Sequence, residues 1–171
     1  TQLVFAAEPA GSVSGVALST QPSVQAQDAA GNVDADFTGT VALTQASAGA
    51  LSGTTSLSAT AGVATYSGIT YTATADDQTF ALTAAATGLT SVVSSTLTSQ
   101  VTATQLVFAT APAGSVSGAA LSTQPVIEAR DANGVVDADF TETITLTEAS
   151  DGTLTGGSVA AVAGVATFTA V

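Results

Sequence analysis

The feature that most constrains this chain is an internal repeat with a period of about 103 residues. The opening residues TQLVF at 1–5 return at 104–108, and the strings PAGSVSG, VDADFT and AGVAT also occur twice. About 37 of the first 53 aligned positions are identical in the two copies. Solenoid units are typically only about 20 to 50 residues long, so a repeat of this length is a whole domain. We therefore predict two domains, a complete repeat at 1–103 and an incomplete repeat at 104–171 that lacks the C-terminal strands.

The substitutions between the two copies indicate β-strands. Val24 and Ala26 remain apolar in the second copy. The alternate positions Gln25 and Gln27 become charged there. This period of two is the pattern of a strand with one buried face, and no window of helical length carries an apolar stripe. We therefore expect an all-β fold. The strands expected in the first repeat are 2–6, 23–28, 39–45, 56–59, 63–73 (one strand or two), 78–87 and 91–103.

The number and spacing of these strands favour a particular architecture. About seven short strands in 100 residues, separated by turns rich in Gly, Asp and Asn, are typical of an immunoglobulin-like β-sandwich. The stretch 97–106 between the repeats has neither Pro nor Gly and looks like a nearly continuous strand. A linker without flexible residues is stiff. We therefore predict tandem immunoglobulin-like β-sandwich domains that follow one another end to end.

Three sequence elements resemble the bacterial immunoglobulin-like repeats of the invasin and intimin type, which form tandem arrays in large surface adhesins. They are the opening strand LVF at 3–5, the turn V-x-x-x-D-x-x-G-N at 24–32, and GVAT followed by an aromatic residue at 62–66. The resemblance implies an extracellular module on a bacterial cell surface. The chain departs from the family pattern in its few aromatic residues and its complete lack of Lys.

The composition excludes many kinds of chemistry. The chain has 13 acidic residues and one basic residue, Arg130, and it contains no His, Cys or Lys. Without these types it cannot build a Ser-His-Asp triad, a Cys nucleophile, a His/Cys zinc site or a lysine Schiff base. A nucleic-acid surface needs several basic residues together. No apolar run reaches the roughly 18 residues of a membrane span. We therefore expect no enzyme activity, no catalytic or cofactor-binding residues, no nucleic-acid partner and no membrane insertion.

The acidic residues of one long turn are the candidates for binding a metal ion. They are Asp28, Asp34 and Asp36 in the first repeat and Asp131, Asp137 and Asp139 in the second. Ca²⁺ prefers several oxygen ligands from one loop, and the family resemblance implies ions at the junctions of adhesin repeats. Asp is also common in turns because its carboxylate accepts bonds from nearby backbone amides. The turn lacks the EF-hand spacing, so turn capping is favoured, no metal ligand is assigned, and Ca²⁺ binding is the alternative.

The remaining charged residues have simpler interpretations. Glu8, Asp76 and Asp77 are expected to be solvated loop charges. Arg130 is expected to pair with Glu128 or Glu142 across strands, in a surface ion pair that contributes little stability.

The expected function is structural. The chain is interpreted as a spacer module whose partners are the neighbouring repeats of the same stalk, on a bacterial adhesin or a similar extracellular protein. The alternative is a subunit of a self-assembling surface layer or filament. A carbohydrate-binding module is disfavoured because it needs a row of aromatic residues. The counterparts of 78–87 and 91–103 are missing before Val171, which is expected to leave an open sheet edge. Either the sequence is a piece of a longer chain, or another chain supplies these strands.

Overall fold

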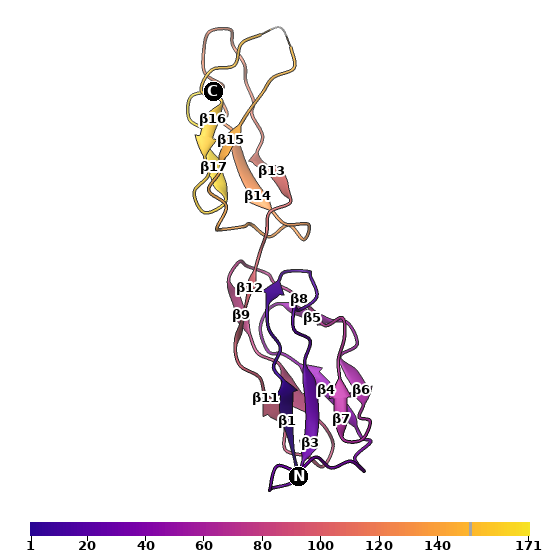
Figure 1. Cartoon of the computed structure of the whole chain (residues 1–171). Helices are drawn as coiled ribbons and strands as arrows, with labels where there is room; N and C mark the ends of the chain where they lie inside the picture. The colour runs from indigo at the N-terminus through magenta and orange to yellow at the C-terminus, as the bar shows by residue number, and fades with distance from the viewer. Residues whose placement is uncertain (151) are drawn as a thin grey trace. The chain divides into compact units, whose positions relative to one another are not determined.

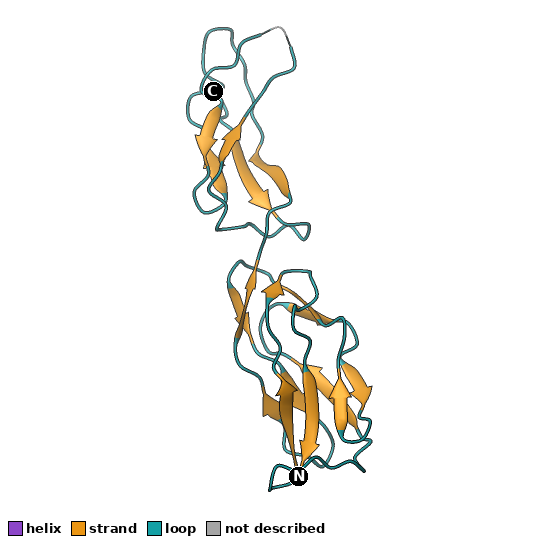
Figure 2. Cartoon of the chain, in the orientation of Figure 1, coloured by secondary structure: helices purple, strands orange, loops and turns teal. Residues whose placement is uncertain are grey.

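The computed structural model describes residues 1–150 and 152–171. These described residues form strands, turns and irregular loops but no helix (Figure 2), so no helix among them could span a membrane. The chain divides into two compact units, which we call unit 1 (Thr1–Gln100) and unit 2 (Val101–Val171). The all-β class expected from the sequence is confirmed.

Unit 1 contains two main sheets and two small ones (Figure 1). Its strands are β1 (Gln2–Ala7), β2 (Ser12–Val13), β3 (Ser23–Gln27), β4 (Thr40–Thr44), β5 (Ala50–Ser52), β6 (Ser56–Ser58), β7 (Val63–Thr65), β8 (Thr70–Thr72), β9 (Gln78–Phe80), β10 (Thr83–Ala85), β11 (Val92–Val93) and β12 (Leu97–Gln100). The main sheets have the orders β1-β3-β7 and β11-β10-β4-β6. The small sheets are β2-β12-β9 and β5-β8.

The two main sheets of unit 1 share one apolar core. Val24 and Ala26 on β3 are buried, and so are Val41 and Leu43 on β4. All four belong to the same cluster of buried side chains. Because each strand turns every second residue inward, two sheets can close over a common interior, and the unit is sandwich-like.

Two buried tyrosines anchor this core. The hydroxyl of Tyr66 donates a 2.9 Å hydrogen bond to the carbonyl oxygen of Val41 on the opposite sheet. Burial raises the pKa of Tyr66 to about 12. The ring of Tyr71 stacks on that of Phe80 with 3.8 Å between centroids, and its hydroxyl lies 2.6 Å from Ser47 Oγ. Buried tyrosines need such partners, because an unpaired hydroxyl is costly in an apolar interior.

Unit 2 reproduces the register of unit 1. Its strands are β13 (Gln105–Thr110), β14 (Val126–Arg130), β15 (Thr143–Thr145), β16 (Ser158–Ala160) and β17 (Val165–Thr167). Leu106 lies opposite Ala129, as Leu3 lies opposite Ala26, and the register shifts at the equivalent place in both strand pairs. The sheets are β13-β14-β17 and β15-β16. The sequence repeat is therefore also a repeat of strand pairing.

The glycine of the GVAT motif is required for the same structural reason in both units. Gly62 and Gly164 have φ values of 79° and 77°, in the left-handed region. A Cβ at either position would lie 2.3 Å from a carbonyl oxygen, that of Asp34 or Asp137. Glycine is required because no other residue tolerates both the conformation and the close approach. The motif therefore lets the strand pack against the acidic turn.

The observed strands differ from the expected ones in three ways. The stretches 78–87 and 91–103 each hold two strands rather than one continuous strand, and of the two possibilities for 63–73 the structure has two strands. Strands β2 and β5 were not expected, because short segments beside Gly11 and Gly49 resemble turns. The expected continuous strand over 97–106 is wrong: β12 ends at Gln100 and β13 begins at Gln105.

Residues 101–103, which the sequence assigned to the first repeat, belong to unit 2. The backbone amide of Ala103 donates to Asp137, and that of Thr104 donates to the carbonyl oxygen of Arg130. These two bonds hold the segment before β13 to unit 2. End-to-end packing of the repeats stays a prediction.

Candidate functional site

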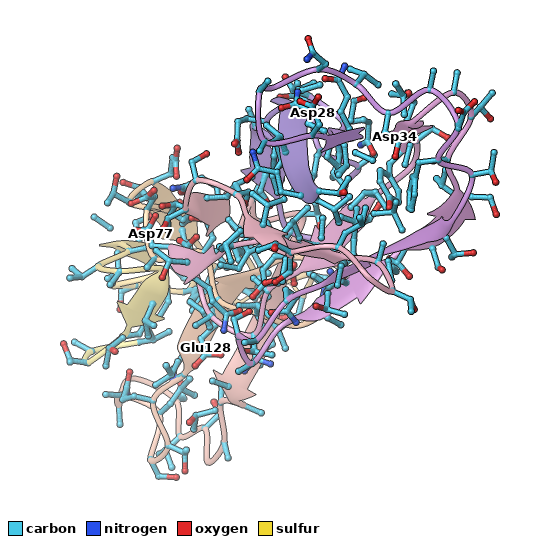
Figure 3. All side chains as sticks on the ribbon, turned by 90° about the horizontal axis from the view of Figure 1, so that it is seen from below. Asp28, Asp34, Asp77 and Glu128 are labelled. Carbon is cyan, nitrogen blue, oxygen red and sulfur yellow. The ribbon has the colours of Figure 1, made fainter. Side chains whose placement is uncertain are left out.

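The acidic turn of unit 1 begins directly after β3 with Asp28 and continues to Asp34, and both residues are labelled in Figure 3. The carboxylate of Asp28 accepts hydrogen bonds from its own loop. Its Oδ1 accepts 2.9 Å bonds from the backbone amides of Ala30 and Asn32, and its Oδ2 accepts a 3.1 Å bond from Asn32 Nδ2. The bonds from Asn32 are the main reason that the pKa of Asp28 lies below its usual value. The carboxylate therefore caps the turn that follows the strand.

Unit 2 repeats this arrangement after β14. Asp131 Oδ1 accepts 2.9 Å bonds from the amides of Asn133 and Val135, and Oδ2 accepts a 3.1 Å bond from Asn133 Nδ2. Asp131 is buried, whereas Asp28 is exposed. The same capping geometry at the same repeat position explains why both copies carry Asp here.

A second carboxylate in each turn, that of Asp34 or Asp137, also accepts a hydrogen bond from a nearby backbone amide. Asp34 Oδ1 accepts a 3.2 Å bond from the amide of Asp36, and Asp137 Oδ1 accepts a 3.0 Å bond from that of Asp139. Asp137 makes one further contact, because its Oδ2 accepts a 2.8 Å bond from the amide of Ala103. In unit 2 this turn therefore holds the segment that leads into β13.

These bonds bear directly on the Ca²⁺ alternative. Within residues 1–150 and 152–171, no three acidic side chains gather in a group that could hold a metal ion. The turn-capping interpretation matches the geometry, since the backbone amides of both turns use the carboxylate oxygens. Ca²⁺ binding by either turn stays a hypothesis that a titration can test.

Two of the acidic residues that were expected to be solvated loop charges, Glu8 and Asp77, accept hydrogen bonds from residues distant in sequence. Glu8 Oε2 accepts a 3.1 Å bond from the amide of Ser95, which ties the loop after β1 to the loop before β12. Asp77 Oδ1 accepts a bond from Gln100 Nε2. Glu8 thus joins two loops that are distant in sequence, and Asp77 joins its loop to strand β12.

The single basic residue pairs within its own strand. Arg130 bonds the carboxylate of Glu128, two residues earlier on β14. The expected partner Glu128 is confirmed, but the pairing lies within one strand rather than across strands, because residues two apart on a strand project from the same face. Both side chains are mostly buried, with 33% of Arg130 and 19% of Glu128 exposed, so solvent screens the pair only in part.

Strand β2 and the last strand of unit 1, β12, run side by side in the same direction. Strand β2 pairs in parallel with β12, and the amide of Ser14 donates a 2.8 Å bond to the carbonyl oxygen of Gln100. Buried Ser12 Oγ donates to buried Ser99 Oγ at 3.1 Å. Sequence patterns could not reveal this contact, because β2 is two residues long and lies 87 positions from its partner.

The inward-facing side chains of the first strand are buried in unit 1, but their counterparts in unit 2 are exposed to solvent. On β1, Leu3 is 3% exposed and Phe5 is 8% exposed. On β13, their counterparts Leu106 and Phe108 are 53% and 50% exposed. We call the region around Leu106 and Phe108 the uncovered face of unit 2. Local sequence cannot account for the difference, because TQLVF is the same in both strands.

Comparison of the chain with models of known protein families, with curated proteins and with solved structures finds no match. The function is therefore inferred from the geometry and chemistry described above.

Proposed function

We propose that this chain is a structural spacer, a run of immunoglobulin-like domains from the stalk of a bacterial cell-surface or extracellular adhesin-like protein. The role requires domains that stay folded while a load acts on their ends. The observation that carries the proposal is the parallel contact between strands β2 and β12 of unit 1.

This contact lies where a load would act. The chain enters unit 1 at one end and leaves it at the opposite end after β12 (Figure 1). Pulling on these two ends drives β2 and β12 in opposite directions along their length. Because the strands are parallel neighbours, they can separate only by sliding, which loads their hydrogen bonds together. The amide of Leu3, bonded at 2.9 Å to the carbonyl oxygen of Thr90, adds a second link of the same kind.

Composition and charge fit the same role. The net charge of -12 on 171 residues makes neighbouring chains repel each other and keeps them soluble. Only 5% of the residues are aromatic, and aromatic side chains are the usual anchors of a protein-binding hot spot. A spacer needs no catalytic groups, and a chain without His, Cys or Lys has few residues that could supply them.

One observation favours the alternative, a subunit of a surface layer or filament. The uncovered face of unit 2 leaves apolar side chains on a sheet in solvent. Surfaces of this kind commonly mark interaction sites.

Single-molecule pulling from chosen points tests the spacer proposal. The chain has no Cys, so introduced cysteines define the pulling points. The pair T1C and T102C pulls β2 and β12 in opposite directions, which is shear. The matched pair V16C and T102C pulls both strands from their C-terminal ends, which unzips their bonds one by one. We expect the unfolding force of unit 1 to be several times higher in shear. Equal forces in the two geometries would remove the mechanical basis of the proposal.

A further inference from the structure

The acidic turns of the two units share a backbone conformation but carry their asparagine at different positions. The turn reads DAAGN at 28–32 in unit 1 and DANGV at 131–135 in unit 2. Gly31 and Gly134 have φ values of 88° and 85°. The amide of each glycine donates to the carbonyl oxygen of the Asp three residues earlier, at 3.2 and 3.1 Å. The asparagine therefore follows the glycine in unit 1 and directly precedes it in unit 2.

The order Asn-Gly makes the side-chain amide of Asn133 reactive. Asparagine is a thermolabile residue, because the backbone nitrogen of the next residue can attack its Cγ. Glycine leaves this approach open, whereas the stiff, β-branched Val33 hinders it at Asn32. Among the described residues, no atom beyond the chain neighbours lies within 4 Å of where a Cβ of Gly134 would be. Asn133 is exposed, so water also reaches the site.

We propose that Asn133 and Gly134 form a site of spontaneous covalent modification, at which the asparagine loses its side-chain nitrogen. The nitrogen of Gly134 gives up its proton and bonds to Cγ of Asn133. The bond from Cγ to Nδ2 breaks, ammonia leaves with that proton, and a cyclic succinimide remains. Water then opens the ring. Opening at Cγ gives aspartate, and opening at the main-chain carbonyl carbon gives isoaspartate.

The folded turn restrains this reaction through Asp131. The attacking nitrogen of Gly134 is held by its bond to the carbonyl oxygen of Asp131. The leaving Nδ2 of Asn133 donates a 3.1 Å bond to Asp131 Oδ2. Both bonds must break before the ring closes, so the rate of modification follows how often the turn opens.

The product does not fit the turn that surrounds it. A carboxylate at position 133 replaces the amide that donates to Asp131, a residue that is only 4% exposed. Two carboxylates at hydrogen-bond distance repel each other. The only basic residue in the sequence, Arg130, already bonds Glu128. The new charge therefore acts against the cap that Asp131 provides.

The isoaspartate product disturbs the turn in a second way. Its linkage adds a methylene to the main chain between residues 133 and 134. The amide of Val135 donates a 2.9 Å bond to Asp131 Oδ1, and its carbonyl oxygen accepts a 2.9 Å bond from the amide of Asp131. Both bonds span the lengthened segment. This goes beyond the spacer role, because it gives one repeat an irreversible loss of stability with age that the other repeat lacks.

The test ages the full chain of 171 residues in mildly alkaline buffer, in which the backbone nitrogen loses its proton more readily. We expect peptide mass spectrometry to find conversion at Asn133 about tenfold or more faster than at Asn32. The variant D131A should speed the conversion, because it frees Nδ2 of Asn133.

Two matched double variants exchange the turn sequences. N133A/V135N gives unit 2 the sequence DAAGN, which forms the same turn in unit 1, and should convert as slowly as Asn32. A30N/N32V gives unit 1 the sequence DANGV and should make unit 1 reactive. In the aged chain, and in N133D, amide hydrogen exchange at Val135 should be faster and the melting temperature of unit 2 lower, with unit 1 unchanged.

Three outcomes would overturn the proposal. Equal conversion of Asn133 and Asn32 would show that the Asn-Gly order has no effect in this turn. An unchanged rate in D131A would remove the restraint assigned to that residue. Complete conversion that alters neither the exchange at Val135 nor the melting of unit 2 would show that the turn accepts a second carboxylate.

Discussion

The same five residues, TQLVF, form the first strand of both units, yet two of their side chains are buried in unit 1 and half-exposed in unit 2. Strand pairing does not cause the difference, because β1 and β13 pair with their neighbours in the same register. The difference comes from the segment 70–100, which covers the face in unit 1. A strand's alternation thus determines which side chains point inward, whereas residues far along the chain determine whether they are buried.

The largest effect should come from removing the same aromatic ring in each unit. F5A takes a buried ring out of a packed core and should lower the free energy of unfolding of unit 1 by about 3 kcal/mol or more. F108A removes a ring that is half in water, so the loss in unit 2 should be below about 1.5 kcal/mol. Denaturant unfolding followed by hydrogen exchange in each unit measures both. Equal losses would mean that the face of unit 2 is covered in solution.

The tyrosine that differs between the units offers a second comparison. Tyr66 in unit 1 has a pKa of about 12, and Phe168 takes its place in unit 2. Because the unfolded chain loses this proton near its usual pKa of 10, the stability of unit 1 should fall between about pH 10 and pH 12, by up to about 1.4 kcal/mol per pH unit.

The variant Y66F is the control for this pH effect. It should abolish the alkaline loss and cost about 1 kcal/mol at neutral pH, because the bond to Val41 is gone. A slope that persists in Y66F would assign the pH dependence to another group.

Removing the capping aspartate of each turn, Asp28 or Asp131, should change the melting temperatures of the two units by different but smaller amounts. D131A removes a buried carboxylate that bonds two backbone amides, so it should lower the melting temperature of unit 2. D28A removes the same bonds at an exposed site, and its effect on unit 1 should be smaller. Because the pKa of Asp28 is lowered, its contribution is present above about pH 4 and is lost as the pH falls further. Thermal unfolding of both variants at pH 7 and pH 3 checks the order, and a larger effect of D28A would reverse the comparison.

The sequence predicts those features of the fold and the acidic turns that depend on contacts between residues close together along the chain. Period-two alternation in 23–27 was enough to place β3 and to predict that Val24 and Ala26 face inward. The capping role of Asp28 also follows from local spacing, because its partners lie within four residues. The pairing of β2 with β12 joins residues 87 positions apart, and no local pattern announces it. The missing counterparts of 78–87 and 91–103 predicted an open sheet edge in the second repeat, but local patterns did not predict the exposure of Leu106 and Phe108.

The smallest expected effect is that of calcium. If the turns only cap their own amides, NaCl at matched ionic strength should raise the melting temperature as much as CaCl₂ does, through screening of the acidic repeat. The variant D34A should then change neither response. A specific rise at micromolar to millimolar Ca²⁺, lost in D34A, would instead show an ion site formed only in the folded state.

The central claim is that unit 1 resists force through the parallel contact between β2 and β12, which the described residues of unit 2 do not form. In unit 2 the residues 115–116, which correspond to β2, form no strand. Pulling the whole chain from its two ends should therefore give two unequal unfolding events, a low-force event for unit 2 and a high-force event for unit 1. Two events of equal force, or a weaker unit 1, would contradict the account.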